Sequence, residues 1–321
     1  VCMMPNTKPV IDNVDMLQYV TDKAEEVTDL NLYTIAAMTA GQEGEYLTDF
    51  EALKDAGAIA VSDNGGTIMN ARTARQAMRQ AAEVDIPVFA HCEDTNLAAR
   101  GVMNAGERAK ELGLFGIMDA VEDVIVARDI LLAKNTGAKL HISHVSNKES
   151  VFIIKTAREQ GINVTAEVAP HHFTLTEDAV LKYGTNARMN PPLRTEDDRA
   201  KIIEGIKDGT IDMIVTDHAP HSEEEKAKPL ESAPSGITGL ETSLALGIKS
   251  LVEPGHISLM KLMELMSKNP AEFYRMVPGS VTKGAPADLV IFGEKETWTV
   301  RKEDFASKAS NSPFIGWELP G

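Results

Sequence analysis

The stretch AKLHISHVSNKESVFIIKTAREQGINVTAEV, residues 138–168, contains the repeating unit from which the fold is predicted. Residues 138–143 and 162–168 are short apolar runs typical of strands, and residues 147–160 between them fit a helix. Most apolar runs of this chain are continuous rather than alternating, as expected for parallel strands covered on both faces. A strand, a helix and a second strand in this order predict a βαβ unit.

The same alternation extends along most of the 321 residues. Strands are predicted at residues 1–4, 31–38, 57–62, 86–90, 138–143, 162–168 and 211–215. Helices are predicted after Asn13, which can cap one, and at residues 71–83, 121–132, 147–160, 196–207 and 240–252. We therefore predict an α/β fold, a TIM-type (β/α)8 barrel in which the first of eight strands is missing. An open doubly wound sheet is the alternative, but no GxGxxG turn follows any predicted strand.

The C-terminal part is predicted to differ from the barrel. The segment KGAPADLVIF (283–292) is typical of a turn followed by an antiparallel strand. We expect residues 1–280 to form the incomplete barrel and residues 281–321 to form part of a small β domain.

Composition narrows the class of protein. The net charge of −16 argues against a nucleic-acid partner, because phosphate neutralisation needs a basic surface. The sequence contains no run of eighteen apolar residues, so no membrane span is predicted, and the first residues do not resemble a signal peptide. The only cysteines, Cys2 and Cys92, do not make a disulfide framework, which suits the cytoplasm, and Cys92 is expected to be a packing residue.

Polar side chains gather where the predicted strands end. They are Asn6, Asp63, His91, His141, His144, His171, His172, Asp217, His218 and His221. A lone histidine at such a place is more often a structural residue than a ligand, but seven of the eight histidines lie at strand ends and only His256 does not. In a barrel these ends form the active site. Imidazole and carboxylate are the ligands that Zn²⁺ takes when one position stays open for water, so the pattern predicts metal-assisted hydrolysis.

Several short motifs carry a family resemblance over nearly the whole chain. They are PNTKP (5–9), AHCED (90–94), HISHVS (141–146), EVAPHH (167–172), MNPPLR (189–194), TDHAPH (216–221), GAPADLVIF (284–292) and NSPFIGW (311–317). Together they resemble bacterial dihydroorotases of the amidohydrolase superfamily. Hydantoinases and allantoinases share the fold but differ in MNPPLR and TDHAPH.

The resemblance implies a metal-dependent hydrolase barrel that interconverts N-carbamoyl-L-aspartate and L-dihydroorotate in pyrimidine synthesis, with two zinc ions. The implied metal ligands are Asp63, His91, His144 and Asp217. Asp63 would bridge the two ions. Family members often have two acids after the serine at this point, whereas this chain has Asp63 and Asn64.

The resemblance also implies roles in catalysis and substrate binding. Asp217 would act as general base and then as general acid. The implied substrate contacts are Asn6, Asn190, His221, Ser235 and Gly236. The family often has phenylalanine where this chain has Ser235, so that contact is expected through the backbone. His141, His171, His172 and His218 receive no assigned role, and His172 and His218 are expected to support the ligands.

One element of the family pattern is missing. The family's first strand ends in an HxHxR motif that supplies two further metal ligands and an arginine, and no such motif occurs in this sequence. We expect the chain to be a truncated piece of an intact enzyme, the alternative being a naturally shortened, inactive homologue. With four of six ligands, such a piece is expected to hold metal weakly and to be inactive by itself.

Two other functions stay open on this evidence. The chain could be another cyclic-amide hydrolase, of hydantoinase or allantoinase type, or a noncatalytic homologue that binds aspartate transcarbamoylase, a partner for which the sequence gives no support. Otherwise we expect a small-molecule substrate, no membrane or nucleic-acid partner, and a homodimer.

Overall fold

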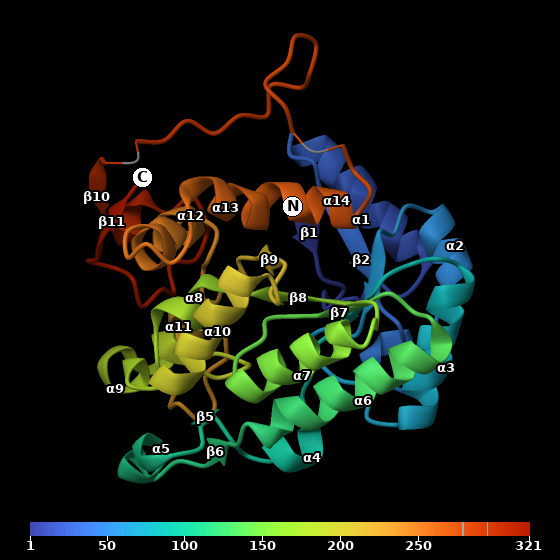
Figure 1. The fold of residues 1–321 in the computed structure, drawn as a ribbon, viewed down its shortest axis with the longest axis horizontal. Coiled ribbons are helices and arrows are strands. Elements are labelled where there is room, and N and C mark those ends of the chain that lie inside the picture. The colour runs from blue at the N-terminus through green and yellow to red at the C-terminus, as the bar shows by residue number, and fades with distance from the viewer. Residues whose placement is uncertain (278, 294) are drawn as a thin grey trace. The chain divides into compact units, whose positions relative to one another are not determined.

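The computed structural model describes residues 1–277, 279–293 and 295–321, which form an α/β fold with two compact units (Figure 1). Unit 1 comprises Val1–Ala98, Ala120–Ser143 and Phe152–Ala166. Unit 2 comprises Ala99–Asp119, His144–Val151 and Glu167–Gly321.

The seven predicted strands are all present and form one parallel sheet. Their bounds are β1 Cys2–Met3, β2 Tyr33–Ala36, β3 Ala60–Ser62, β4 Val88–Ala90, β7 Leu140–Ile142, β8 Val164–Val168 and β9 Met213–Ile214. Their order in the sheet, β1-β2-β3-β4-β7-β8-β9, follows the order along the chain, as it does in a (β/α)8 barrel. Strand β8 pairs with β7 through Val164–Ala166 and with β9 through Glu167 and Val168.

Unit 1 holds β1 to β4, β7, the start of β8 and the helices that follow these strands. The helices are α1 Val14–Val27, α2 Phe50–Asp55, α3 Ala71–Glu83, α4 Thr95–Ala98 and α6 Ala120–Thr136, with a 3-10 turn at Ala40–Gln42. As predicted, the side chain of Asn13 caps α1 by accepting a hydrogen bond from the Met16 amide. Helix α3 runs beside α6 (Figure 1) and buries Ala74, Ala77 and Ala81, whose small side chains allow close approach of a helix.

Unit 2 holds β9, the end of β8 and shorter helices. They are α5 Glu107–Leu112, α8 Pro170–Thr174, α9 Ala179–Tyr183, α10 Glu196–Asp208, α11 Glu223–Lys226, α12 Ser243–Gly247, α13 Leu259–Met263 and α14 Asn269–Phe273, with π-helical turns at Ile248–Val252 and Glu264–Lys268 and 3-10 turns at Gly184–Ala187 and Lys302–Asp304. Helix α7, Lys148–Glu159, begins in unit 2 and ends in unit 1. Helix α10 starts with a capping box between Thr195 and Asp198 and stops at Gly209 in the left-handed conformation.

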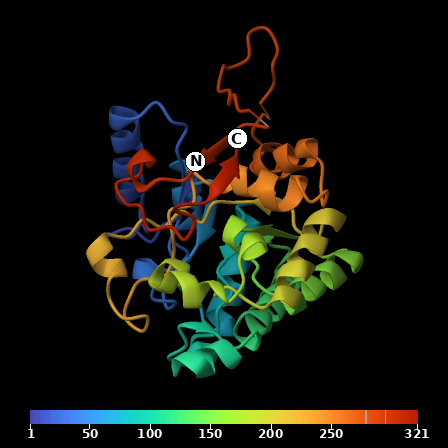
Figure 2. The same ribbon diagram turned by 90° about the vertical axis from the view of Figure 1, so that its left-hand side faces the viewer.

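Two small sheets complete unit 2. Strands β5 (Met103–Asn104) and β6 (Gly116–Ile117) are parallel, and β10 (Thr297–Thr299) and β11 (Glu318–Pro320) are antiparallel, the latter pair drawn as red arrows in Figure 2.

The prediction of a strand within residues 283–292 is wrong. Lys283 and Gly284 do form a turn, but the residues after it extend away from the rest of unit 2 without regular structure (Figure 2). Val290 and Ile291 are 78% and 96% exposed. In the described part of the chain no strand pairs with this segment, so its apolar sequence has no sheet to join.

No helix among the described residues is both long and apolar enough to cross a membrane.

Candidate active site

In unit 1, Asp63 directly follows β3 and is almost completely buried. Its Oδ1 accepts hydrogen bonds from the amides of Met38 (2.8 Å) and Thr39 (3.0 Å), and its Oδ2 accepts one from the Thr39 hydroxyl (2.5 Å). Burial raises the pKa of Asp63 above its ordinary value, although these hydrogen bonds oppose the shift. Besides any role as a ligand, Asp63 therefore holds the loop that follows β2.

The turn after Asp63 brings Asn6 close to the backbone. Gly65 has a φ of 93°, and a Cβ atom at this position would lie 3.3 Å from the side-chain nitrogen of Asn6. Both the left-handed backbone and this close approach favour glycine. The side-chain oxygen of Asn64 is buried and makes no hydrogen bond with any described residue. Two amide side chains thus lie at the ends of β1 and β3.

His91 directly follows β4 and is 5% exposed. Its Nε2 lies 3.0 Å from Oε2 of Glu93, and its carbonyl oxygen accepts a hydrogen bond from the Thr67 hydroxyl at 2.6 Å. A carboxylate on one imidazole nitrogen fixes the ring and its tautomer, as it commonly does for histidines that bind metals. Glu93 was missed in the sequence, although it lies within the AHCED motif.

In unit 2, His144 and Asp217 share an unusual backbone conformation. Their φ angles are 34° and 45°, and they are two of six non-glycine residues with positive φ in the described ranges. Such a conformation costs about 1–3 kcal/mol and persists where the surroundings enforce it, most often at functional sites. Both are predicted metal ligands.

Asp217 lies beside His171, a residue without an assigned role in the sequence. Nε2 of His171 is 3.7 Å from Oδ2 of Asp217, and burial lowers the pKa of His171 to about 3. The imidazole is therefore neutral near pH 7. The side chain of Asp217 is 29% exposed, so this carboxylate, unlike that of Asp63, reaches solvent.

The other histidines of the sequence prediction have identifiable structural contacts. Nε2 of His172 donates to the carbonyl oxygen of Pro191 (3.0 Å), and Nδ1 of His218 accepts from the amide of Gly239 (3.1 Å). Burial lowers the pKa of both His172 and His218. His141 in unit 1 is fully buried, with its Nδ1 2.7 Å from the Thr165 hydroxyl.

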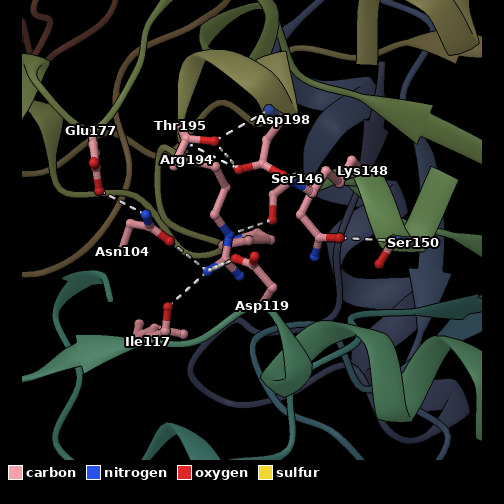
Figure 3. A network of polar contacts seen from close by, with 12 residues as sticks. Asn104, Ile117, Asp119, Ser146, Lys148, Ser150, Glu177, Arg194, Thr195 and Asp198 are labelled. Atoms are coloured by element: carbon pink, nitrogen blue, oxygen red, sulfur yellow. Dashed lines mark hydrogen bonds and ion pairs between the residues drawn. The ribbon is translucent and has the colours of Figure 1, made fainter. Parts of the chain in front are cut away.

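A network around Arg194 fixes the segment that carries Asn190 (Figure 3). The buried guanidinium donates to the Asn104 side chain (3.0 Å), the Ile117 carbonyl (2.7 Å) and the Ser146 hydroxyl (3.2 Å), and it pairs with Asp119 at 3.1 Å. A buried arginine is tolerated only when its donors are satisfied in this way.

Arg194 ends the motif MNPPLR, while the bond from His172 to Pro191 holds the middle of it. The peptide bond between Asn190 and Pro191 is cis. The residues that directly follow Asn190 are anchored at Pro191 and at Arg194, which the sequence did not indicate.

The predicted substrate residues His221, Ser235 and Gly236 lie together in unit 2. Nε2 of His221 donates to the carbonyl oxygen of Ser235 at 2.9 Å. Gly236 has a φ of 106°, and a Cβ atom there would lie only 2.5 Å from that of Ala219, so the loops of residues 216–221 and 233–237 meet at a glycine.

Two residues missed in the sequence hold these loops in place. Asn311 accepts from the His221 amide (3.0 Å) and donates to the carbonyl oxygens of Ala219 and Gly236, each at 3.1 Å. The ammonium of Lys226 donates to the carbonyl oxygens of Pro234 (2.9 Å) and Gly236 (3.0 Å). Burial lowers the pKa of Lys226 to about 8. The NSPFIGW motif was the available signal for Asn311; Lys226, in an acidic run, gave none.

The predicted ligands fit a metal by their chemistry. Asp63 and His91 belong to unit 1, and His144 and Asp217 belong to unit 2, so each unit by itself contains one carboxylate and one imidazole of the predicted set. In the parts of the chain described here, no three His, Cys, Asp or Glu side chains are grouped as a metal site. Carboxylate and imidazole together are a donor set that zinc accepts.

Comparison with known proteins identifies the family. A family model described as dihydro-orotase-like matches residues 1–150. The dihydroorotase of Clostridioides difficile (strain 630) is 51% identical over 321 residues, which are 100% of this chain and 76% of the relative. The dihydroorotase of Clostridium acetobutylicum is 46% identical with the same coverage.

Solved structures show the same fold. The L-hydantoinase (dihydropyrimidinase) from Arthrobacter aurescens matches with a TM-score of 0.87 and 24% identity, over 99% of this chain and 73% of that one. The D-hydantoinase (dihydropyrimidinase) from Thermus sp. gives a TM-score of 0.82 and 21% identity with the same coverage. These confirm the predicted barrel class. Curated dihydroorotases are 51% and 46% identical to this chain over its whole length. The chain therefore belongs to the dihydroorotase family, whose members are enzymes that act on a cyclic amide.

Proposed function

We propose that the enzyme to which this chain belongs catalyses the reversible cyclisation of N-carbamoyl-L-aspartate to L-dihydroorotate, a step of pyrimidine synthesis in the cytoplasm. The observation that carries the proposal is the 51% identity to a dihydroorotase over all 321 residues. The hydantoinases share the fold at 24% identity or less, which favours dihydroorotate over hydantoin as the substrate.

We propose zinc as the metal, held as two ions by Asp63, His91, His144 and Asp217 together with further ligands. The strained backbones of His144 and Asp217 and the contact between His91 and Glu93 support this assignment. Asp63 already accepts three hydrogen bonds, and a carboxylate has about four acceptor positions, so Oδ2 has one left for a cation. Bound zinc would polarise the amide carbonyl and lower the pKa of a bound water to about 7.

Asp217 is proposed to move the proton in this reaction. Its carboxylate takes a proton from the attacking water and delivers it to the ring nitrogen that leaves, and it does the reverse during ring closure. The partial exposure of this side chain gives it access to substrate. The imidazole of His171, whose Nε2 is 3.7 Å from Oδ2 of Asp217, is neutral and does not compete with this carboxylate as an acid.

Substrate binding is proposed for two groups of residues. Asn6 and Asn190 carry amides that can donate to and accept from the ring edge. His221 would contact the substrate carboxylate, next to the backbone of Ser235 and Gly236. Because Nε2 of His221 donates to the Ser235 carbonyl, a carboxylate contact requires either Nδ1 or a change of partner.

Removal and return of metal test this function. Protein expressed from its complete gene should open the ring of L-dihydroorotate, lose this activity when a chelator removes its metal, and recover it with added zinc. Full activity in thoroughly metal-free protein, or no activity with zinc restored, would contradict the proposal.

The assembly and the division of the chain are also proposals. We propose a homodimer, and a barrel at residues 1–280 joined to a small β domain at residues 281–321. Sedimentation at several concentrations tests the dimer, and co-purification with aspartate transcarbamoylase would instead indicate a mixed complex.

A further inference from the structure

We propose that Asn64–Gly65 is a self-modification site, at which the side-chain amide of Asn64 converts into a carboxylate. The site lies in the turn that follows β3, and the conversion places a second acid directly after Asp63. This inference rests on the chemistry of the turn and does not depend on the proposed function.

The sequence singles out this position. Asn64 is the only one of the chain's asparagines that glycine follows. The reaction begins when the backbone nitrogen of the next residue attacks the side-chain carbonyl carbon of the asparagine. A following side chain hinders that attack, whereas glycine has no Cβ and the widest conformational freedom.

The structure leaves both reacting groups without competing hydrogen bonds. The turn is closed by a bond from the Gly66 amide to the Asp63 carbonyl at 2.8 Å, and Gly65 is exposed with a φ of 93°. Neither the Gly65 amide nor the Asn64 side-chain oxygen has a hydrogen-bond partner among the residues that the structure describes. The backbone nitrogen of Gly65 can therefore attack Cγ of Asn64 without first breaking a hydrogen bond.

Asn311 provides the contrast. It is followed by Ser312, also a small residue, but it is 6% exposed and its side chain makes three hydrogen bonds, to the His221 amide and to the carbonyl oxygens of Ala219 and Gly236. Those bonds must break before its side chain can react, so this position should resist conversion.

The chemical step balances with water alone. The Gly65 nitrogen forms a bond to Cγ of Asn64, the proton of that nitrogen leaves, and the Cγ–Nδ2 bond breaks to release ammonia. Water then opens the cyclic imide at either carbonyl, giving an ordinary aspartate at this position or its isomer, in which the backbone runs through the side chain. In sum, one amide and one water become one carboxylic acid and one ammonia, with no change of oxidation state.

The product changes the charge of this turn. A carboxylate at position 64 adds one negative charge to a chain that already carries −16, directly after the buried Asp63. The modified and unmodified forms should therefore separate by ion exchange.

Peptide mass spectrometry of protein aged in ¹⁸O-labelled water tests the proposal. Asn64 should convert at least about tenfold faster than Asn311, which corresponds to a barrier difference of about 1.4 kcal/mol. The new carboxylic acid should carry one ¹⁸O atom. This label distinguishes asparagine that converts during the experiment from asparagine that had converted before it. Conversion should also accelerate with rising pH, because the attacking nitrogen must lose its proton.

Two variants serve as controls. Gly65→Ala should slow the conversion but strains the turn, so Asn64→Gln, which keeps an amide while disfavouring the five-membered imide, provides a second control that should fold. An Asn64 that stays unlabelled, or that converts no faster than Asn311, would overturn the proposal. Equal conversion in Asn64→Gln would overturn it as well.

Discussion

Asp63 and Asp217 occupy equivalent places in two regions of the molecule and yet have different environments. Each follows a strand of the parallel sheet, β3 in unit 1 and β9 in unit 2. Asp63 is 3% exposed and accepts three hydrogen bonds, while the side chain of Asp217 is 29% exposed and its backbone is strained. Two acids at comparable strand ends therefore differ in their hydrogen bonds, and these hydrogen bonds decide whether an acid also maintains the fold.

The largest effect is expected at Asp217. Asp217→Asn keeps the shape of the side chain and tolerates the positive φ, but it removes the proton carrier. Turnover of dihydroorotate should fall by about 10²–10⁴ while the unfolding midpoint stays unchanged. A fall in turnover that is matched by a comparable loss of stability would place Asp217 with Asp63 as a structural acid.

Asp63 should behave in the opposite way. Asp63→Ala removes the acceptor of three hydrogen bonds and leaves the buried amides of Met38 and Thr39 unsatisfied, which should lower the free energy of unfolding by about 3 kcal/mol or more. Urea denaturation measures this. Asp63→Asn, which keeps Oδ1, should cost clearly less, and equal losses for both variants would contradict the account.

The regular elements could be predicted from the sequence, and the contacts within the site could not. The periodicity of apolar residues located all seven sheet strands and helices such as α3, because each βα unit is specified by its own local pattern. The two-residue strands β5 and β6 carry no such pattern, and the apolar run at residues 283–292 has no strand partner in the described chain. Local pattern alone therefore predicts a strand only where the fold supplies a neighbour for it.

The site shows the same division. The ends of the predicted strands indicated Asp63, His91, His144, Asp217 and His221, and the family resemblance added Ser235 and Gly236. Neither indicated the hydrogen bonds that hold these residues. Asn311 lies 90 residues after the amide of His221 that it binds, and Arg194 lies 90 residues after Asn104. No short window of sequence contains both partners, so these contacts became visible only in the structure.

A smaller effect is expected from the anchor of the Asn190 segment. Arg194→Lys keeps the charge but cannot reach three acceptors with one ammonium, and it should cost about 2 kcal/mol of stability. The Michaelis constant for dihydroorotate should rise more than turnover falls if the segment positions substrate. Arg79→Lys, at an exposed surface pair with Glu83, is the matched control and should change little.

The smallest predicted effect depends on pH. The pKa of Lys226 is lowered to about 8 in the folded chain from an ordinary value of 10.5, so between these values the unfolded chain holds a proton that the folded chain has released. The unfolding free energy of the wild type relative to Lys226→Met should therefore rise as pH rises from about 8 to 10.5, by about 1 kcal/mol after allowance for solvent screening. A difference that stays constant or falls over this range would contradict the burial of a charged lysine here.

The proposed dihydroorotase activity is tested most sharply by the substrate preference of the protein expressed from its complete gene. The values of kcat/KM for L-dihydroorotate, hydantoin and allantoin should be measured side by side, with the Asp217→Asn variant as the background. We expect a clear preference for dihydroorotate that disappears in the variant. A preference for hydantoin or allantoin, or dihydroorotate turnover that survives the substitution, would contradict it.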